Sequence, residues 1–353
     1  MKAAVLYGDY DLRYEDFPEP EIRPGCVKVR VCACGVCGSD IPRITAGGAH
    51  YYPIVLGHEF SGFVTEVGEE VTSLQTGDHV AAIPLIPCMK CRDCQQGNYS
   101  QCKHYTFIGS RIQGGYADYV VLPEQNALKI DPAIPFEQGA LFEPSTVALH
   151  GIRRTNYQGG KTVAVLGGGT IGLFTFQWAK ILGAKTVVVF GRSKQHLAVA
   201  ERLGADAVIS TLDEDFMEQA LAWTDGVGFD YVFEAAGTPV TMRLAFELAA
   251  NHSDVCMIGT PVGELTFSQR EWELLNRKEF RLTGSWMSGS APYPGEEWRL
   301  TAECFANGKL KYDPAVFHCQ IPLRDTEQIV SVLRERSKIK GRVLLLNPVR
   351  EEE

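Results

Sequence analysis

The 353-residue sequence contains no uninterrupted apolar run of the roughly 20 residues that a membrane-spanning helix needs. Residues 1–16 (MKAAVLYGDYDLRYED) lack the apolar core of a signal peptide. The sequence also lacks internal repeats and low-complexity segments, apart from a short acidic terminus. These absences fit a soluble protein, and we expect a cytoplasmic location with no membrane partner.

Positive charge is not in excess, because 34 lysines and arginines stand against 43 aspartates and glutamates, which gives a net charge of −9. The acidic residues are scattered along the chain, so we expect no surface that binds nucleic acid. The length is sufficient for two domains, each able to bury its own core.

Cysteine is plentiful, and four of the eleven cysteines follow a C-x2-C-x2-C-x7-C spacing: Cys88, Cys91, Cys94 and Cys102. Four thiolates this close can surround one Zn²⁺ tetrahedrally, which leaves no open position and indicates a structural site. A cluster of disulfides is the alternative, although no secretory context supports it. The spacing therefore predicts a structural zinc lobe.

A second, open metal site is predicted from the segments GVCGSD, LGHEF and LFEPSTVALH. Their candidate ligands are Cys37, His58 with Glu59, and Glu143. Three protein ligands plus one exchangeable position form a catalytic zinc geometry. Each segment alone is weak, because such residues are often turn or capping residues, but their joint occurrence favours a metal. The remaining cysteines are expected to be reduced core residues: Cys26, Cys32, Cys34, Cys256, Cys304 and Cys319.

Residues 161–184 predict a buried apolar strand, a glycine-rich turn and an amphipathic helix. The turn fits G-x-G-x-x-G through Gly167, Gly169 and Gly172. The diphosphate of a dinucleotide would bind at the start of the helix, at Thr170 and Ile171, where unpaired N–H groups favour an anion. The segments TVVVFGRS, KQHLAVAERLGA, FDYVFEAAG and DVCMIGTP continue the sequence with a strand, a helix and two strands, which is typical of a Rossmann fold.

Taken together, these motifs resemble the zinc-dependent medium-chain dehydrogenase/reductase superfamily along nearly the whole chain. Within it, the sequence is most similar to polyol dehydrogenases of the galactitol-1-phosphate 5-dehydrogenase family. Long strings carry this resemblance: GGAHYYPIVLGHEFSG, YSQCKHYTFIGSR, GGYADYVV and GSWMSGSAPYPGEEW. The resemblance implies an α/β protein with a GroES-like catalytic domain and a Rossmann domain, two Zn²⁺ ions, NAD(P) as cofactor, and a dimer or tetramer.

Two domains are therefore expected. Residues 1–152 contain short β-runs broken by glycine and proline, which predict an irregular β-barrel, and residues 153–287 form the doubly wound parallel Rossmann domain. Residues 288–353 are expected to return to the first domain with the structural zinc lobe. There, a helix is predicted between Asp325 and Gly341, followed by a strand at VLLL.

The chemistry expected of these parts is the oxidation of a secondary alcohol. Zn²⁺ lowers the pKa of bound water from 15.7 to roughly 7 in favourable sites, and the same Lewis acidity makes an alkoxide accessible near neutral pH. Hydride would pass to a nicotinamide held in the cleft between the domains. By the resemblance, Ser39 begins the relay that removes the proton, although it could be only a turn residue.

Two carboxylates, Glu59 and Glu143, are candidate zinc ligands with different support. Glu59 is either a direct ligand or a carboxylate that orients one, because adjacent side chains reach one metal only if the backbone bends between them. Polyol dehydrogenases similar to this chain carry glutamate at the position of Glu143, which favours Glu143 as a ligand.

Substrate recognition is less clear from the sequence. A sugar-alcohol phosphate requires hydroxyl partners and a cation, for which arginine is preferred. The candidates lie in or beside the strings that carry the resemblance: Arg43, His50, Tyr51, Arg111 and Trp286. Each of them could instead be a solvated loop residue or a core aromatic.

The end of the second Rossmann strand departs from the NAD-specific pattern. NAD-specific members place an acidic residue there to bind the ribose hydroxyls, whereas this chain has Gly191. Nothing at that position repels a 2′-phosphate, and Arg192, Ser193 and Lys194 could bind one. We therefore expect NAD(P) with a preference for NADP, unless these residues merely cap the next helix.

Three interpretations follow. The first is a zinc- and NAD(P)-dependent dehydrogenase of a polyol phosphate such as galactitol 1-phosphate. The second is a dehydrogenase of an unphosphorylated polyol or another small secondary alcohol, similar to sorbitol, iditol or threonine dehydrogenases. The third, a catalytically silent nucleotide-binding protein, is disfavoured because Cys37, His58, Glu59 and Glu143 are all present.

Overall fold

The computed structural model describes residues 1–335 and 338–348, which form two compact units. The described residues of the first unit are 1–143, 289–306 and 317 onward, and those of the second are 144–288 and 307–316. Residues 336–337 and 349–353, which belong to the predicted catalytic domain, lie outside the described residues. The domain limits and roles expected from the sequence remain predictions.

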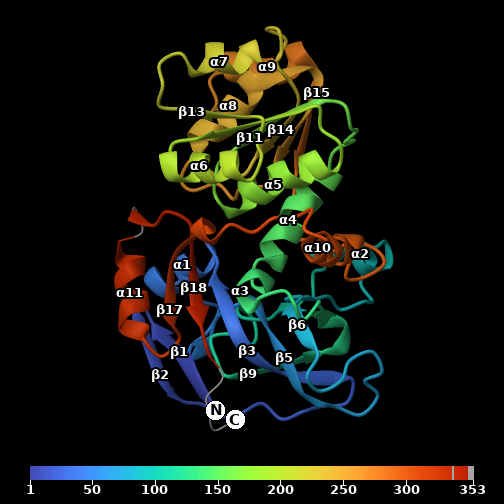
Figure 1. Ribbon diagram of the computed structural model, residues 1–353, viewed down its shortest axis with the longest axis vertical. Coiled ribbons are helices and arrows are strands. Elements are labelled where there is room, and N and C mark those ends of the chain that lie inside the picture. The colour runs from blue at the N-terminus through green and yellow to red at the C-terminus, as the bar shows by residue number, and fades with distance from the viewer. Residues whose placement is uncertain (336–337, 349–353) are drawn as a thin grey trace. The chain divides into compact units, whose positions relative to one another are not determined.

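The first unit is built around a seven-stranded sheet (Figure 1). In sheet order its strands are β10 (Ala127–Lys129), β6 (His79–Ala82), β5 (Glu59–Val67), β3 (Cys26–Val36), β18 (Arg342–Leu346) and β17 (Phe317–Pro322), with β9 (Tyr119–Pro123) paired to β3. Nearly all of β3 is buried, because β5, β9 and β18 all pair with it. Apolar residues such as Val29, Phe60 and Leu345 fill the core.

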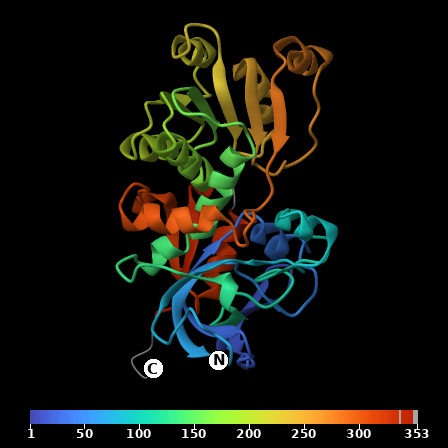
Figure 2. The ribbon, with the colours of Figure 1, turned by 90° about the vertical axis from the view of Figure 1, so that its right-hand side faces the viewer.

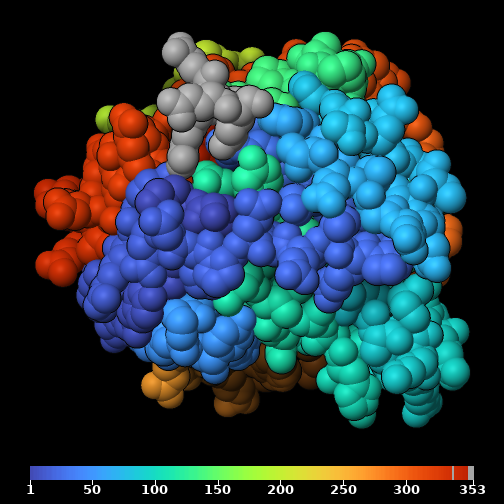
Figure 3. Space-filling view, turned by 90° about the horizontal axis from the view of Figure 1, so that it is seen from below, coloured from blue at the N-terminus to red at the C-terminus, as the bar shows by residue number. Residues whose placement is uncertain are grey.

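Shorter elements complete this unit, whose surface is seen in Figure 3 with the N-terminal residues in dark blue. The strands β1 (Lys2–Gly8), β2 (Asp11–Asp16) and β4 (Ile54–Val55) form one small sheet, and β7 (Leu85–Ile86) and β8 (Thr106–Phe107) form another. The helices are α1 (Asp40–Thr45), α2 (Arg92–Gln95), α3 (Phe136–Gly139), α10 (Glu296–Ala306) and α11 (Thr326–Arg334), with 3-10 turns at Tyr99–Gln101 and Glu124–Asn126. Helix α4 (Phe142–Arg153) starts here and continues into the second unit.

The predicted tail is confirmed in part. Strand β18 covers the VLLL string, and α11 begins directly after Asp325. The helix ends at Arg334, however, well before Gly341. Its last turn tightens, since the Glu335 N–H bonds to the carbonyl of Val332 three residues back, and the Glu335 backbone leaves the helical region.

The second unit is a six-stranded parallel sheet with helices on both faces, as Figures 1 and 2 show. In sheet order the strands are β13 (Ala207–Ser210), β12 (Thr186–Gly191), β11 (Thr162–Leu166), β14 (Phe229–Glu234), β15 (Ala249–Met257) and β16 (Arg281–Gly284). The helices are α5 (Thr170–Ile181), α6 (Lys194–Arg202), α7 (Phe216–Ala222), α8 (Pro239–Leu248) and α9 (Gln269–Lys278), with a 3-10 turn at Pro314–Val316.

This strand order is that of a doubly wound Rossmann sheet, as predicted. Helices α5 and α6 pack on one face and α8 and α9 on the other (Figure 1), so β11 and β12 are buried almost throughout. The strand order reverses between β11 and β14, and ligands of such sheets bind at that point, beyond the carboxyl ends of the strands. Among the described residues, no helix is long and apolar enough to cross a membrane.

Candidate metal centres and cofactor turn

The four cysteines of the predicted lobe lie together in the first unit. Cys88, Cys91, Cys94 and Cys102 place their sulfur atoms within 4.8 Å of one another. The Cys91 sulfur lies 3.5 Å from that of Cys94 and 3.8 Å from that of Cys102. Zn–S bonds of about 2.3 Å at tetrahedral angles separate the sulfur atoms by about 3.8 Å, whereas a disulfide needs about 2.05 Å. The geometry fits four ligands of one zinc ion.

The backbone around these sulfurs favours thiolates. The N–H of Cys94, opposed by partial burial, lowers the pKa of Cys91 to about 6. The N–H of Cys88 also points at the sulfur of Cys102, at 3.3 Å. Burial raises the pKa of Cys94 to about 12, so this thiol needs a cation beside it to ionise. A metal ion would supply that charge.

The second cluster is formed by residues at the end of β3 and at the start of β5. Cys37, His58 and Glu59 place one potential ligand atom each within 4.8 Å of one another. His58 and Glu59 are almost fully buried, whereas Cys37 is partly exposed. Two sequence segments predicted to meet at a metal are therefore brought together, and one of the three residues is partly exposed.

Asp40, on the first turn of α1, supports this cluster and was not among the residues predicted from the sequence. It is completely buried, and its carboxylate accepts hydrogen bonds from the Cys37 N–H at 3.2 Å and the Tyr116 hydroxyl at 3.3 Å. Its other oxygen lies 3.6 Å from His58 Nδ1. Nδ1 makes no hydrogen bond at this distance, but the carboxylate lies on the side of the ring from which it would orient a metal-ligating histidine. A carboxylate three residues after a candidate ligand was the available signal.

Glu59 is held between β3 and β18. One carboxylate oxygen lies 2.9 Å from the guanidinium of Arg342, while Oε2 is buried without a hydrogen-bond partner. The side chain lies over Gly35 on the paired strand, where a Cβ would collide with Oε2. Burial raises the pKa of Glu59 to about 8, and Arg342 opposes the shift. An orphaned buried carboxylate oxygen beside Cys37 and His58 fits a cation.

Arg342 was not found from the sequence, because only the pairing of β18 with β3 brings it to this site. Its Nη1 also bonds to the Val36 carbonyl at 3.2 Å. Burial works against the guanidinium charge, but Glu59 and Cys37 more than offset it and raise the pKa of Arg342. This residue fixes the position of the Glu59 carboxylate.

Glu143, on the first turn of α4, lies outside the group of three. Its oxygens do not meet the mutual 4.8 Å distance that joins Cys37, His58 and Glu59. Burial raises the pKa of Glu143 to about 7, with Glu59 adding to the shift and His58 opposing it. The carboxyl is therefore close enough to interact electrostatically with the cluster, and its role as a ligand stays a prediction.

Ser39 and Arg43 lie at the edge of the same site. The Ser39 N–H approaches the Cys37 sulfur at 3.5 Å. Arg43 Nη1 donates to Ser39 Oγ at 2.9 Å and to Asp40 at 3.2 Å. Since Oγ already accepts from Arg43, the Ser39 hydroxyl hydrogen is free to point elsewhere.

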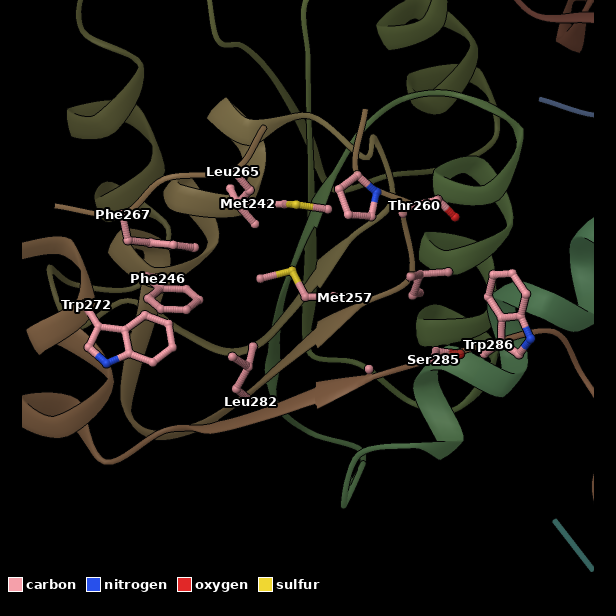
Figure 4. Close-up of a pocket in the computed structure, with 14 residues that line it drawn as sticks. Met242, Phe246, Met257, Thr260, Leu265, Phe267, Trp272, Leu282, Ser285 and Trp286 are labelled. Carbon is pink, nitrogen blue, oxygen red and sulfur yellow. The ribbon is translucent and has the colours of Figure 1, made fainter. Parts of the chain in front are cut away.

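The other predicted substrate residues divide between the two units. Burial lowers the pKa of His50, and the nearby charges of Arg111 and Arg43 lower it further, so the neutral imidazole is favoured beside two arginines. Arg111 is exposed and stacks on the Tyr105 ring at 4.5 Å. Trp286 belongs to the second unit, where it lies half exposed at the end of an apolar groove of about 430 Å³ (Figure 4).

The glycine-rich turn has the form that a diphosphate requires. Gly169 precedes α5, and a Cβ on it would meet nothing within 4 Å, so ligand atoms can approach the backbone there. No side chain caps the helix start at Thr170 and Ile171, whose N–H groups have no intrahelical acceptor. Gly172 packs so closely on Gly167 that a side chain would collide with its carbonyl. The turn fits a dinucleotide.

The residues after β12 in part cap the next helix, which was the alternative to binding a 2′-phosphate. Ser193 is the N-cap of α6 and accepts a hydrogen bond from the His196 N–H at 3.4 Å, so it does cap the next helix. Its hydroxyl hydrogen remains able to donate to a phosphate. Arg192 is exposed beside Gly191. A Cβ built on Gly191 would lie 3.7 Å from the Gly168 nitrogen. The end of β12 therefore borders the glycine-rich turn.

Known proteins match both parts of the chain. The family description "Alcohol dehydrogenase GroES-like domain" matches residues 23–132, and "Zinc-binding dehydrogenase" matches residues 170–306. Galactitol 1-phosphate 5-dehydrogenase of Escherichia coli K12 is 38% identical over 349 residues, covering 98% of this chain and 100% of that protein. Sorbitol dehydrogenase of Bacillus subtilis strain 168 is 32% identical over 266 residues, covering 74% of this chain and 75% of that protein.

Solved structures of similar dehydrogenases match the fold of this chain. The crystal structure of galactitol-1-phosphate dehydrogenase from Escherichia coli superposes with a TM-score of 0.91 at 37% identity, covering 98% of this chain and 100% of that one. A zinc-binding dehydrogenase from Sinorhizobium meliloti 1021 bound to NADP gives 0.86 at 29% identity, covering 98% of each chain. With its four-cysteine and Cys/His/Glu clusters, the chain thus belongs to the zinc- and NAD(P)-dependent alcohol and polyol dehydrogenases of the medium-chain dehydrogenase/reductase superfamily.

Proposed function

We propose that the protein oxidises a secondary alcohol of a polyol phosphate, with galactitol 1-phosphate as the first candidate, to a ketose phosphate. The observation that carries this proposal is the pair of arginines, Arg43 and Arg111, that lies around His50 beside the metal cluster, where Arg43 bonds to Ser39 and Asp40. Two arginines beside a catalytic site suit a phosphate better than a neutral hydroxyl. The similarity to galactitol 1-phosphate 5-dehydrogenase supports the same substrate class.

Cys37, His58 and Glu59 would hold the catalytic zinc, with Glu143 as a further carboxylate ligand and Asp40 orienting His58. Once bound, the ion supplies Lewis acidity that lowers the pKa of an alcohol. Ser39, two residues after Cys37 and held by Arg43 at 2.9 Å, would accept the alcohol proton while it passes its own hydroxyl hydrogen on to solvent, and would so begin the relay. The four-cysteine lobe would hold the second zinc and take no part in the chemistry.

Galactitol 1-phosphate is expected to give a kcat/KM about 10- to 100-fold above that of galactitol, since a charge-assisted phosphate contact contributes about 1.5–3 kcal/mol. Arg111→Ala should remove most of this difference by slowing only the phosphorylated substrate. Arg13→Ala is the matched control, because Arg13 stacks on Tyr7 at 4.6 Å in the same unit, much as Arg111 stacks on Tyr105. Steady-state kinetics with galactitol 1-phosphate, galactitol, sorbitol and threonine measure the effect.

If free polyols or threonine react as well as the phosphorylated substrate, the proposal of a phosphate pocket is wrong. The second candidate, a dehydrogenase of an unphosphorylated polyol, then takes its place, as the similarity to sorbitol dehydrogenase would suggest. A dimer or tetramer and a cytoplasmic location are part of the proposal, and light scattering and cell fractionation would test them.

For the cofactor we propose a preference for NADP, resting on Gly191 and the exposed Arg192 beside the glycine-rich turn. Arg192→Ala should lower kcat/KM for NADP⁺ about 10- to 100-fold and leave NAD⁺ unchanged. Gly191→Asp with Arg192→Ile should shift the preference to NAD⁺. A Cβ at Gly191 meets only Leu197 Cδ2 closely, at 3.3 Å, so a small side-chain shift makes room for the aspartate.

Arg202→Ala is the control for this experiment, because Arg202 lies on the last turn of α6 and pairs with Asp313. It should change neither cofactor. A wild-type enzyme that strongly favours NAD⁺, with no loss for NADP⁺ on Arg192→Ala, would mean that the segment only starts a helix. Equal use of both cofactors would indicate dual specificity.

A further inference from the structure

Glu234, the last residue of β14, is a buried carboxylate that the proposed chemistry does not use. It has no exposed surface. One oxygen, Oε1, accepts hydrogen bonds from the N–H groups of Ala236 and Gly237, both at 2.9 Å, and from the Thr241 hydroxyl at 2.7 Å. The side chain therefore folds forward and fixes the turn that leads from β14 into α8.

Glu234 also stabilises a second turn, the one that follows β15. The backbone carbonyl of Glu234 accepts from Ile258 N–H at 2.8 Å and Gly259 N–H at 2.9 Å, in the turn that follows β15. Its other carboxylate oxygen, Oε2, is buried without a hydrogen-bond partner and faces Gly259, where a Cβ would lie only 2.6 Å away. A further bond, from Val262 N–H to the Gly237 carbonyl at 2.9 Å, closes the two turns on each other.

The two turns lie where the nicotinamide half of a bound cofactor would extend. The diphosphate belongs at the start of α5, after β11, and the adenosine half belongs on the β12 side, where Gly191 and Arg192 lie. The nicotinamide half must then extend to the other side of β11, over the carboxyl ends of β14 and β15. The first turn also borders the glycine-rich turn, because a Cβ on Gly167 would lie 3.0 Å from the Ala236 nitrogen.

We propose that Glu234 is a positioning residue for the nicotinamide half of the cofactor, which it controls by holding the turns after β14 and β15 in one fixed arrangement. The residue touches neither substrate nor cofactor; it acts through the backbone of residues 235–238 and 258–262. The inference rests on the NAD(P) binding of the family and is independent of which alcohol the enzyme oxidises.

The test compares two ligands that share the adenosine and diphosphate groups but differ in the nicotinamide. Calorimetric titration would first measure Kd for the reduced dinucleotide, either NADH or NADPH, whichever the wild type binds more tightly. It would then measure Kd for the part of that dinucleotide without nicotinamide, which is ADP-ribose or 2′-phospho-ADP-ribose. Glu234→Ala is expected to raise Kd for the dinucleotide at least tenfold and to leave Kd for the ADP-ribose part within twofold. A general loss of structure would weaken both ligands equally.

Two further variants make the test specific. Glu234→Gln keeps the Oε1 acceptor, so it should restore dinucleotide binding to within about threefold, although its buried amide lowers thermal stability. Glu271→Ala is the matched control, because Glu271 is also a carboxylate at a helix start in this unit, bonded to the Ser268 N–H at 2.7 Å. It should lower stability without changing the ratio of the two Kd values.

If Glu234→Ala does not fold, Thr241→Val carries the test, since it removes the hydroxyl that donates to Oε1 at 2.7 Å, together with the capping contacts of that hydroxyl to Thr238 at the start of α8. It is expected to raise the dinucleotide Kd about threefold and to spare the ADP-ribose part. Equal losses for both ligands, no loss for either, or a Glu234→Gln protein that binds as poorly as Glu234→Ala would overturn the proposal.

Discussion

Cys37→Ser is expected to lower kcat/KM by a factor of about 1,000 or more while the protein stays folded. Cys37 is one of the three residues whose ligand atoms meet in the second cluster, and it is the only one that is partly exposed. A serine hydroxyl does not replace a thiolate as a zinc ligand, and the ion contributes several kcal/mol to such a reaction, at 1.36 kcal/mol for each factor of ten. Its partial exposure predicts a small effect on folding.

Three measurements check this result together: kcat/KM, the melting temperature and the zinc content per chain. Zinc should fall from two ions to one, with the melting temperature nearly unchanged. Cys319→Ser is the control, because Cys319 is a partly buried cysteine on β17 that belongs to neither cluster. Wild-type protein purified without chelator that holds one zinc or none would contradict the assignment of two metal sites.

Cys91→Ser is expected to do the reverse, lowering the melting temperature by about 10 °C while the folded protein at 25 °C keeps its kcat within a few-fold. Helix α2 itself contributes little packing to the lobe, since it has four residues and Cys94 is the only buried one, while Tyr99 and Ser100 contact Tyr293 and Gly289. Structural zinc binding contributes roughly 10–16 kcal/mol in small domains, and losing about a third of that corresponds to about 10 °C at 2–4 °C per kcal/mol.

Calorimetry and zinc release to a chromogenic chelator would measure this effect, with Cys319→Ser again as the control. The Cys91→Ser protein should release its lobe zinc first and retain the ion of the catalytic cluster. A variant with normal thermal stability and no activity would show that the lobe takes part in catalysis, which contradicts the four-sulfur geometry.

Features that depend on neighbouring residues in the sequence were predictable. The four cysteines lie within one short segment, so their spacing alone limits how they can meet. The turn after β11 was equally clear, because a buried strand, three glycines and a helix follow in immediate succession. The resemblance to a superfamily then supplied the fold of both units.

Features that depend on pairing between distant strands were not predictable. Arg342 meets Glu59 only because β18 pairs with β3 and β3 pairs with β5. Glu234 has no motif of its own, and its proposed role follows from hydrogen bonds of its side chain to the turn after β14 and of its backbone carbonyl to the turn after β15. The position of Glu143 shows a related limit, since a family pattern names a candidate ligand but does not fix its distance to the other ligands.

The pairing of β18 with β3 also has a consequence during translation, because β18 is synthesised long after β3. Cys37, His58 and Glu59 leave the ribosome early, but Arg342 is made after the whole of residues 144–288, which supply the second unit. Until then β3 lacks one of its neighbours, and the Glu59 carboxylate lacks the guanidinium that neutralises it. A nascent chain therefore has its zinc ligands long before it has their counter-charge, and the site is completed only when one of the last strands is added.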